Sequence, residues 1–315
     1  MNSSNTEFVV LKILIIGGTR FVGKALVSRL IEKGHDITLF TRGNNPLPSN
    51  VHHIRGDRFN KSDLVQLASS KWDVIADTSG RKLVDTQLVL EFAGKPKFRF
   101  LYVSSAGVYS DSGYWPIDEN SPIDPQSRHI GKADTENWLE DENIPFTSFR
   151  PTYIYGPGNY NPIEKWFFDR ITLERPIPLP LWGVFITQLG HVFDLAESMS
   201  RSLSFESAKN KIYNCSGTKA ITLKALVDEF AVVCQKKPSD LDIRSFDPSS
   251  LDPKGRKLFP LRISHFQVDT SLIQKELNWQ PKFDLKAGLK DSYENDYLIS
   301  NKDATDFSGD EILIG

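Results

Sequence analysis

The chain has 315 residues, of which 39% are hydrophobic and 25% are charged, and its formal net charge is −2. This composition is typical of a globular protein of about two domains, and it excludes a chain that is basic over its whole surface, as many nucleic-acid-binding domains are. The two cysteines, Cys215 and Cys234, stand in apolar surroundings, which excludes a disulfide framework or a zinc site built from cysteines and predicts two buried thiols.

The first predicted elements form a strand, a glycine-rich turn, a helix and a second strand. An apolar run over 11–16 predicts the first strand. Apolar residues spaced by four, at Val22, Leu26 and Leu30, predict the helix, which Gly34 ends. The second strand is predicted over 35–42. This order is the context that a dinucleotide-binding glycine motif requires.

The alternation of helix and strand continues along the first half. It predicts helices over 61–70, 83–93 and 128–140 and strands over 72–80, 98–105 and 144–151. Alternating elements with nearly all-apolar strands indicate an α/β fold, with a doubly wound parallel Rossmann sheet. We expect a Rossmann domain over 8–156 with 184–236, and a smaller C-terminal domain of the substrate-binding type over 157–183 with 237–315.

The glycine turn has the sequence GGTRFVG, and its middle glycine is replaced by Arg20. Gly17 suits the tight turn, Gly23 lets helix and strand pack closely, and the Arg20 guanidinium is suited to clamp a phosphate. The predicted cofactor contacts in the turn are Gly17, Gly18, Thr19, Arg20, Phe21, Val22 and Gly23. The alternative is a nucleotide fold whose pocket has decayed.

The end of the second strand indicates which cofactor is preferred. An acidic residue there would accept a hydrogen bond from the ribose of NAD, but this chain has Arg42. Arg42 suits a 2′-phosphate, so we predict NADP over NAD; the alternative is a solvated arginine. Asp57 and Lys132 complete the predicted cofactor contacts.

The second half contains an aromatic segment and a basic one. Trp166, Phe167 and Phe168 are predicted to lie in a helix core. Further along, Phe259 and Phe266 alternate with a predicted RNA-binding set of cations, which is Lys254, Arg256, Lys257 and Arg262. Basic residues with aromatic neighbours can serve looped RNA through phosphate contacts and stacking. A solvated face is the alternative.

Three segments, LYVSSAGVY, RPTYIYGPG and HVFDLAESM, resemble the extended short-chain dehydrogenases. The resemblance implies that Ser105 lies beside a reacting carbonyl and that Lys132 belongs to a catalytic Tyr-Lys pair. The residue four before Lys132 is Arg128, however. A guanidinium cannot accept a proton near neutral pH, so redox chemistry is not expected.

Other side chains near this position are poor replacements for the missing tyrosine. His129 is rotated from it by about 100° on a helix. Tyr109 and Tyr114 lie upstream and would have to swing in. No H-E-x-x-H, C-x-x-C or calcium loop is found in the sequence, so no metal ligand is predicted.

The chain resembles the chloroplast stem-loop-binding proteins and their cyanobacterial relatives, which are atypical members of the NAD-dependent epimerase/dehydratase superfamily. The similarity rests on Arg20 in the glycine turn, on SRHIGKADTENWL and on FPLRISHFQVD. It implies binding of stem-loop RNA such as messenger 3′ ends, with a retained NADP-type pocket. It also implies metal-dependent endoribonuclease activity, ribosomal or ribonucleoprotein partners, and the plastid stroma or a cyanobacterial cytoplasm.

We further expect a homo-oligomer with no membrane contact. The alternative function is an NAD(P)-dependent nucleotide-sugar epimerase, dehydratase or reductase, which Ser105, Lys132 and Arg42 favour. The third hypothesis is that the chain is a structural component of a larger assembly.

Overall fold

The computed structural model describes residues 9–161, 163–300 and 305–314. It divides into two compact units, which are described separately. The first, here called the sheet unit, comprises Met1–Val108, Ile123–Arg150 and Ala196–Tyr213. The second, called the aromatic unit, comprises Tyr109–Pro122, Pro151–Leu195 and Asn214–Gly315. None of the described helices combines the length and the apolar character that a membrane-spanning segment requires.

In its described part, the sheet unit contains a seven-stranded sheet of order β11-β6-β5-β4-β1-β2-β3. β1 pairs in parallel with β2 and β4, and parallel pairing continues from β2 to β3, from β4 to β5 and from β5 to β6. The strands are β1 Lys12–Ile16, β2 Asp36–Thr41, β3 His52–Arg55, β4 Val74–Asp77, β5 Arg99–Val103, β6 Phe146–Pro151 and β11 Lys211–Cys215. This is the doubly wound order, with its switch point between β1 and β4.

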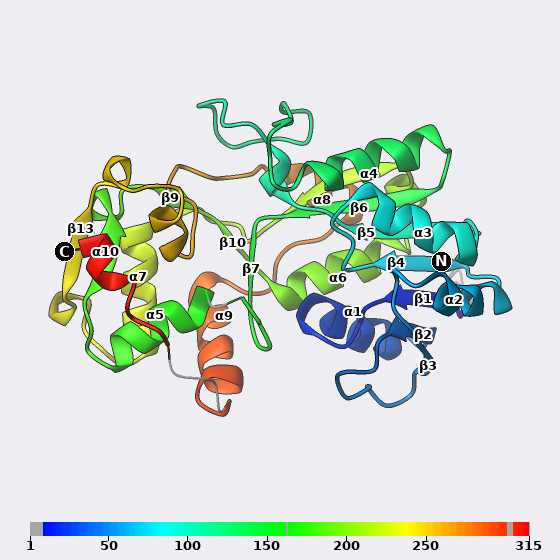
Figure 1. Ribbon diagram of the computed structural model, residues 1–315, viewed down its shortest axis with the longest axis horizontal. Helices are drawn as coiled ribbons and strands as arrows, with labels where there is room; N and C mark the ends of the chain where they lie inside the picture. Colours follow the sequence, from blue (N-terminus) through cyan, green and yellow to red (C-terminus); the bar gives the residue numbers. More distant parts are fainter. Residues whose placement is uncertain (1–8, 162, 301–304, 315) are drawn as a thin grey trace, which may run out of the picture. The chain divides into compact units, whose positions relative to one another are not determined.

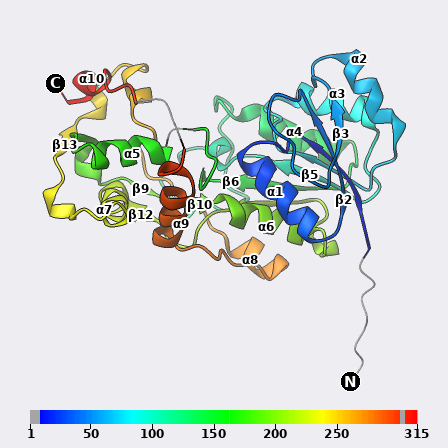
Figure 2. The ribbon, with the colours of Figure 1, turned by 90° about the horizontal axis from the view of Figure 1, so that it is seen from below.

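Helices cover both faces of this sheet, with α1 and α6 on one face and α3 and α4 on the other (Figures 1 and 2). The helices are α1 Phe21–Glu32, α2 Lys61–Leu64, α3 Leu83–Ala93, α4 Ile130–Asp141 and α6 Val192–Ser202. The fully buried strands explain why the sequence reads as continuous apolar runs. The fold class predicted from the sequence is confirmed.

The aromatic unit is built on small sheets and a core of packed rings. β7 Tyr153–Tyr155 pairs with β10 Leu189–His191, β8 Ile177–Pro180 with β13 Ile243–Phe246, and β9 Ile186–Thr187 with β12 Ile221–Thr222. The helices are α5 Ile163–Thr172, α7 Leu223–Val233, α8 Ser271–Leu277, α9 Leu285–Ser292 and α10 Asp310–Ile314. Phe167 of α5 stacks on Phe230 of α7 at 4.8 Å between ring centroids. The predicted core role of Trp166, Phe167 and Phe168 is confirmed, since all three are buried.

The division into units differs from the boundaries predicted from the sequence. Residues 109–122, 151–156, 184–195 and 214–236 lie in the aromatic unit rather than in the Rossmann domain. The reason is packing: α7 carries Leu226 and Phe230 into the same apolar cluster as α5. The core that buries the apolar face of a helix decides to which unit the helix belongs, whatever the position of the helix in the sequence.

Candidate nucleotide site and basic surface

The turn between β1 and α1 is shaped by its glycines. Gly17 and Gly18 have φ values of 98° and 97°, a region that disfavours other residues. A Cβ added to Gly23 would lie 2.7 Å from the Gly18 nitrogen, so only glycine lets the helix come this close. The geometry therefore matches what the sequence predicted for the first and last glycines.

The start of α1 is not capped by the side chain of its own N-cap residue. Arg20 is the N-cap residue; its side chain is exposed and makes no capping hydrogen bond. The first turn of α1 contains no acidic residue. The amides at a helix N-terminus, with the positive end of the helix dipole, suit a phosphate. Phe21 and Val22, predicted as cofactor contacts, have side chains buried in the protein, so they can offer only backbone atoms.

Two arginines lie together where β2 and β3 end. Arg42 follows β2 and is exposed, and Arg55 ends β3 and donates from Nε to the carbonyl oxygen of Arg42 at 3.2 Å. Arg55 could not be predicted from the sequence because β3 is a short edge strand with little apolar content. The predicted contact Asp57 is half-buried, and its Oδ1 accepts from the amide of Phe59 at 3.0 Å.

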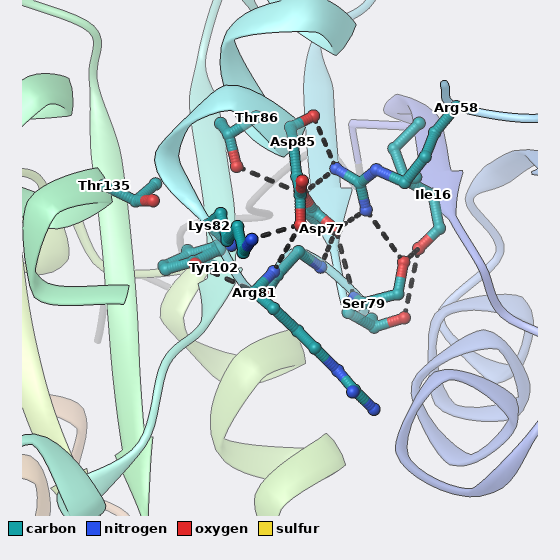
Figure 3. Close-up of polar contacts among 12 residues, drawn as sticks. Ile16, Arg58, Asp77, Ser79, Arg81, Lys82, Asp85, Thr86, Tyr102 and Thr135 are labelled. Carbon is teal, nitrogen blue, oxygen red and sulfur yellow. Dashed lines mark hydrogen bonds and ion pairs between the residues drawn. The ribbon is translucent and has the colours of Figure 1, made fainter. Parts of the chain in front are cut away.

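A buried ion pair occupies the end of β4, beside the switch point of the sheet (Figure 3). Arg58 donates from Nη1 and Nη2 to the two oxygens of Asp77, at 3.0 and 2.7 Å. The same guanidinium also bonds Ser79 Oγ at 3.0 Å and the carbonyl oxygen of Asp85 at 2.7 Å. Arg58 thereby joins the loop after β3 to the loop after β4.

The Asp77 carboxylate is saturated by its own chain. Beyond Arg58, it accepts from the amides of Ser79 and Gly80 at 3.0 and 2.8 Å and from Thr86 Oγ1 at 3.2 Å. Burial raises the pKa of Asp77, but Arg58 and these amides outweigh burial and hold that pKa below its ordinary value. A sequence signal existed, because an Asp that ends an apolar strand needs a partner. The partner itself could not be read from the sequence.

Lys132 of α4 is bound to the main chain of the sheet unit. Its Nζ donates to the carbonyl oxygens of Val103 and Gly80, at 2.6 and 3.0 Å. Burial lowers the pKa of Lys132 to about 8. Ser105 Oγ accepts from the amide of Gly107 at 3.0 Å, so it stabilises the turn that follows β5. Lys132 and Ser105, the two residues of the dehydrogenase pattern that this chain keeps, thus both make structural hydrogen bonds.

The position of the missing tyrosine is exposed. Arg128 lies before α4 with its side chain in solvent, and its Nε contacts His129 Nε2 at 3.0 Å. Tyr109, considered as a replacement, is buried in the aromatic unit and donates to Asn214 Oδ1 at 2.8 Å. Tyr114 is 82% exposed. Tyr109 is therefore held by its own hydrogen bond rather than available to swing.

Arg150 of the R-P motif positions α4. Its Nη2 donates to Glu136 Oε2 at 2.7 Å, and Ser148 Oγ donates to Glu136 Oε1 at 2.6 Å. Glu136 stands one helical turn after Lys132 and is fully buried. The resemblance of this motif to short-chain dehydrogenases therefore reflects a contact that anchors the helix to β6.

The basic segment lies on the aromatic unit. Lys254, Arg256 and Lys257 are exposed around a short 3-10 helix, and Arg262 is half-exposed over the Phe266 ring at 4.2 Å. Phe259 and Phe266 are buried, at 3% and 4% exposure, so they cannot stack on RNA bases as the alternation suggested. Phe259 instead packs against Trp166 of the core, at 5.5 Å between ring centroids.

Cys215 and Cys234, predicted to be buried thiols, are both buried. Within the described residues, no three His, Cys, Asp or Glu side chains gather as metal ligands. Asp194 of the HVFDLA segment accepts from the amides of Lys282 and Phe283, at 2.8 and 3.2 Å. Asp194 therefore holds the segment before α9 within the aromatic unit.

The sheet order and the glycine turn at the end of β1 define a Rossmann dinucleotide-binding fold. A family model described as the NAD dependent epimerase/dehydratase family matches residues 13–216. The chloroplast stem-loop binding protein of 41 kDa b from Arabidopsis thaliana is 39% identical, over 96% of this chain and 84% of that protein. The chain belongs to the NAD-dependent epimerase/dehydratase family.

More distant relatives share the fold. A UDP-glucose 4-epimerase from Corynebacterium glutamicum is 24% identical, over 90% of this chain and 95% of that protein. The solved structure of UDP-glucuronic acid 4-epimerase from Bacillus cereus, in complex with UDP-glucuronic acid and NAD, matches with a TM-score of 0.74 and 18% identity. The match covers 90% of this chain and 98% of that one.

Proposed function

We propose that this chain binds stem-loop RNA, and that it does so on a Rossmann fold that keeps an NADP-type pocket but has lost tyrosine-dependent proton transfer. The observation that carries the proposal is the 39% identity, over nearly the whole chain, to a protein named for stem-loop binding. The name of that relative also supports a plastid location; the plastid stroma is the proposed compartment, with the cytoplasm of a cyanobacterial-type cell as the alternative. Ribonucleoprotein complexes are the proposed setting.

The loss of proton transfer rests on chemistry at α4. Arg128 stands where the family pattern has its tyrosine, and an arginine stays protonated throughout the physiological pH range. Two donors of Lys132 are directed to main-chain oxygens. A general acid–base group contributes about 10²–10⁴-fold to a rate, so its absence removes most of the expected turnover.

The NADP pocket is proposed from the residues that fit it. The N-terminus of α1 and the Gly17–Gly18 turn suit a pyrophosphate, and Arg42 with Arg55 suits a 2′-phosphate. When bound, such a nucleotide would supply hydride chemistry in a complete enzyme. In this chain we assign it a binding role, and we assign no residue to RNA cleavage or to a divalent metal.

The RNA-binding surface is proposed at Lys254, Arg256, Lys257 and Arg262. Three of these cations are exposed and none of the four has a carboxylate partner among the ion pairs of the described residues. Unpaired cations exchange bound counterions for phosphates, and the release of those counterions drives binding.

The test is equilibrium binding of a labelled stem-loop RNA over a series of salt concentrations. We expect the affinity to fall steeply with salt, and the Lys254→Ala/Lys257→Ala double variant to reduce the slope of log K against log salt by about 1–2. The matched control is Lys275→Ala/Lys286→Ala, which removes two exposed charges from α8 and α9 and should leave the slope unchanged.

Three results would contradict the proposal. Weak, salt-independent binding would exclude an RNA-binding surface, and equal slopes for both double variants would exclude the basic segment. Turnover of a nucleotide-sugar by wild type at an ordinary enzymatic rate would favour the epimerase alternative.

A further inference from the structure

A surface pocket of about 280 Å³ lies in the aromatic unit, beside the basic segment. Leu181, Phe185 and Ile263 form apolar walls, and Asp247, Ser249 and Arg256 add polar groups. Pockets for small molecules commonly measure about 300–1,000 Å³, so this one suits a single ring system rather than a dinucleotide. Apolar walls with a cation and an anion at the rim match a heterocycle with a phosphate attached.

Leu181, which lines the pocket, begins a turn whose next residue, Trp182, stands in solvent outside the lining. Leu181, Trp182 and Gly183 have consecutive positive φ values of 45°, 58° and 78°, which is unfavourable for the two non-glycine residues. The amide of Trp182 donates to Ser245 Oγ at 3.0 Å and fixes the turn. The Trp182 side chain is 65% exposed. A strained turn that displays a large ring is typical of a binding site.

A row of rings continues from the pocket. Phe185 of the wall lies 5.5 Å from His265, and His265 lies 5.2 Å from Trp115, between ring centroids. His265 Nδ1 accepts from the amide of Ile186 at 3.1 Å, which fixes this imidazole. Trp115 is 39% exposed. These rings pack edge to face on one another, so they support the wall of the pocket, and the part-exposed Trp115 ends the row.

The charges at the pocket distinguish a phosphate side from a base side. Arg256 is tied by its Nε to the carbonyl oxygen of Leu251 at 3.2 Å, with its Nη groups left for a phosphate. Asp247 Oδ1 accepts from the amide of Ser249 at 2.8 Å, and its carboxylate is exposed. An ionised carboxylate accepts and does not donate hydrogen bonds, so it suits a base edge with an amino group.

We propose that one unpaired base of the stem-loop RNA binds at this pocket and stacks on Trp182 of the adjoining turn, with its phosphate at Arg256 and its amino edge at Asp247. The inference rests on the proposed function and specifies where the loop of the RNA is held. Adenine, cytosine and guanine present an amino group and uracil does not, so uracil is disfavoured at this position.

The experiment measures the affinity of one stem-loop RNA for wild type, Trp182→Ala and Trp182→Phe at fixed salt. Loss of one stacked base weakens binding about 5- to 150-fold, so we expect at least a fivefold loss for Trp182→Ala and less than a threefold loss for Trp182→Phe. The salt slope should stay constant, because no phosphate contact is removed. Ile299→Ala, which truncates a side chain that is 74% exposed elsewhere in the aromatic unit, is the control and should bind as wild type.

RNA variants identify the base. Replacing the loop nucleotides one at a time by abasic nucleotides should reveal one position where wild type loses affinity and Trp182→Ala loses none further. At that position, uracil should bind more weakly than cytosine to wild type, and Asp247→Asn should remove this difference because an amide also donates.

The outcomes separate the inference from the proposed function. If wild type binds the stem-loop and Trp182→Ala binds equally well, the pocket proposal is wrong and the proposed function stands. If wild type binds no RNA, both fail. If Trp182→Ala changes the sedimentation of the protein but not its RNA affinity, the exposed turn is a protein interface and the pocket proposal is overturned.

Discussion

The polar groups of the two units differ in what they bond. In the sheet unit, Asp77, Arg58 and Lys132 lie where a Rossmann protein meets its ligand, yet each is bonded to the chain itself. In the aromatic unit, Lys254 and Lys257 are exposed, and Trp182 is displayed beside a pocket. A site whose donors are already used is rigid and has little to offer a reaction, whereas exposed cations and rings are available to a partner.

The largest expected effect tests whether the Arg58–Asp77 pair is structural. Asp77→Asn leaves the buried Arg58 cation without its counter-charge, which should lower the free energy of unfolding by about 3–5 kcal/mol. Urea unfolding measures it. Glu91→Gln, at the exposed pair with Lys61, is the control and should change the free energy by no more than about 1 kcal/mol.

The same variant has a pH signature. The pKa of Asp77 is below its ordinary value in the folded protein, so its stabilisation is present above about pH 4 and is lost as pH falls through the folded value. The difference between wild type and Asp77→Asn should therefore shrink in acid. A difference that is small at neutral pH, or constant down to pH 2, would contradict the account.

The second prediction concerns His191, a buried polar group of the aromatic unit. His191 is stacked on Phe283 at 3.8 Å between ring centroids, and burial lowers its pKa to about 4, against a weaker opposite effect of Asp291. Asp291 Oδ2 lies 3.3 Å from His191 Nε2 and raises the pKa of His191, but the effect of burial is larger. The unfolded chain therefore binds the proton first.

The pKa of His191 is lower in the folded protein than in the unfolded chain. As pH falls from about 6.5 towards 4, protonation of the unfolded chain at this histidine should therefore lower the free energy of unfolding by up to roughly 3 kcal/mol. His191→Gln should flatten the profile between pH 5 and 6.5, where few carboxylates titrate. Denaturant titrations at several pH values measure it. Parallel profiles for wild type and variant would mean that His191 is not held neutral.

The smallest effect concerns the part of the sheet unit that remains exposed. Arg42→Ala should weaken NADP binding by about tenfold and NAD binding by less than twofold, because only NADP places a phosphate at Arg42. Calorimetric titration with both nucleotides measures it. Lys71→Ala, which removes an exposed charge before β4 begins, is the control. Equal losses of NADP and NAD would remove the basis for the predicted preference.

The sequence predicted the elements whose signals are local. Continuous apolar strands, the spacing of Val22, Leu26 and Leu30 and the glycine turn all identified the doubly wound sheet. β3 was missed because its residues are only half-buried or exposed and carry little apolar pattern. The placement of α7 was missed because its partner helix, α5, lies 50 residues earlier in the chain.

The functional contacts were harder to predict because they depend on distant parts of the chain. Arg58 and Asp77 are 19 residues apart and meet only when the loops after β3 and β4 fold together. Trp182 stands in a proline-rich segment whose exposure depends on three residues with positive φ. The phenylalanines on either side of Arg262 suggested stacking on RNA bases, but they are buried. Aromatic residues serve both in cores and as stacking surfaces, so the pattern alone does not distinguish the two.

The most direct test of the account uses wild-type protein and three RNAs: a stem-loop, the same RNA with one strand of the stem changed to abolish pairing, and a third with compensating changes that restore the stem. At constant salt, we predict that the first and third bind with equal affinity and that the second binds at least tenfold more weakly. Equal affinity for all three, or no binding to any of them, would contradict the claim that this Rossmann protein binds stem-loop RNA.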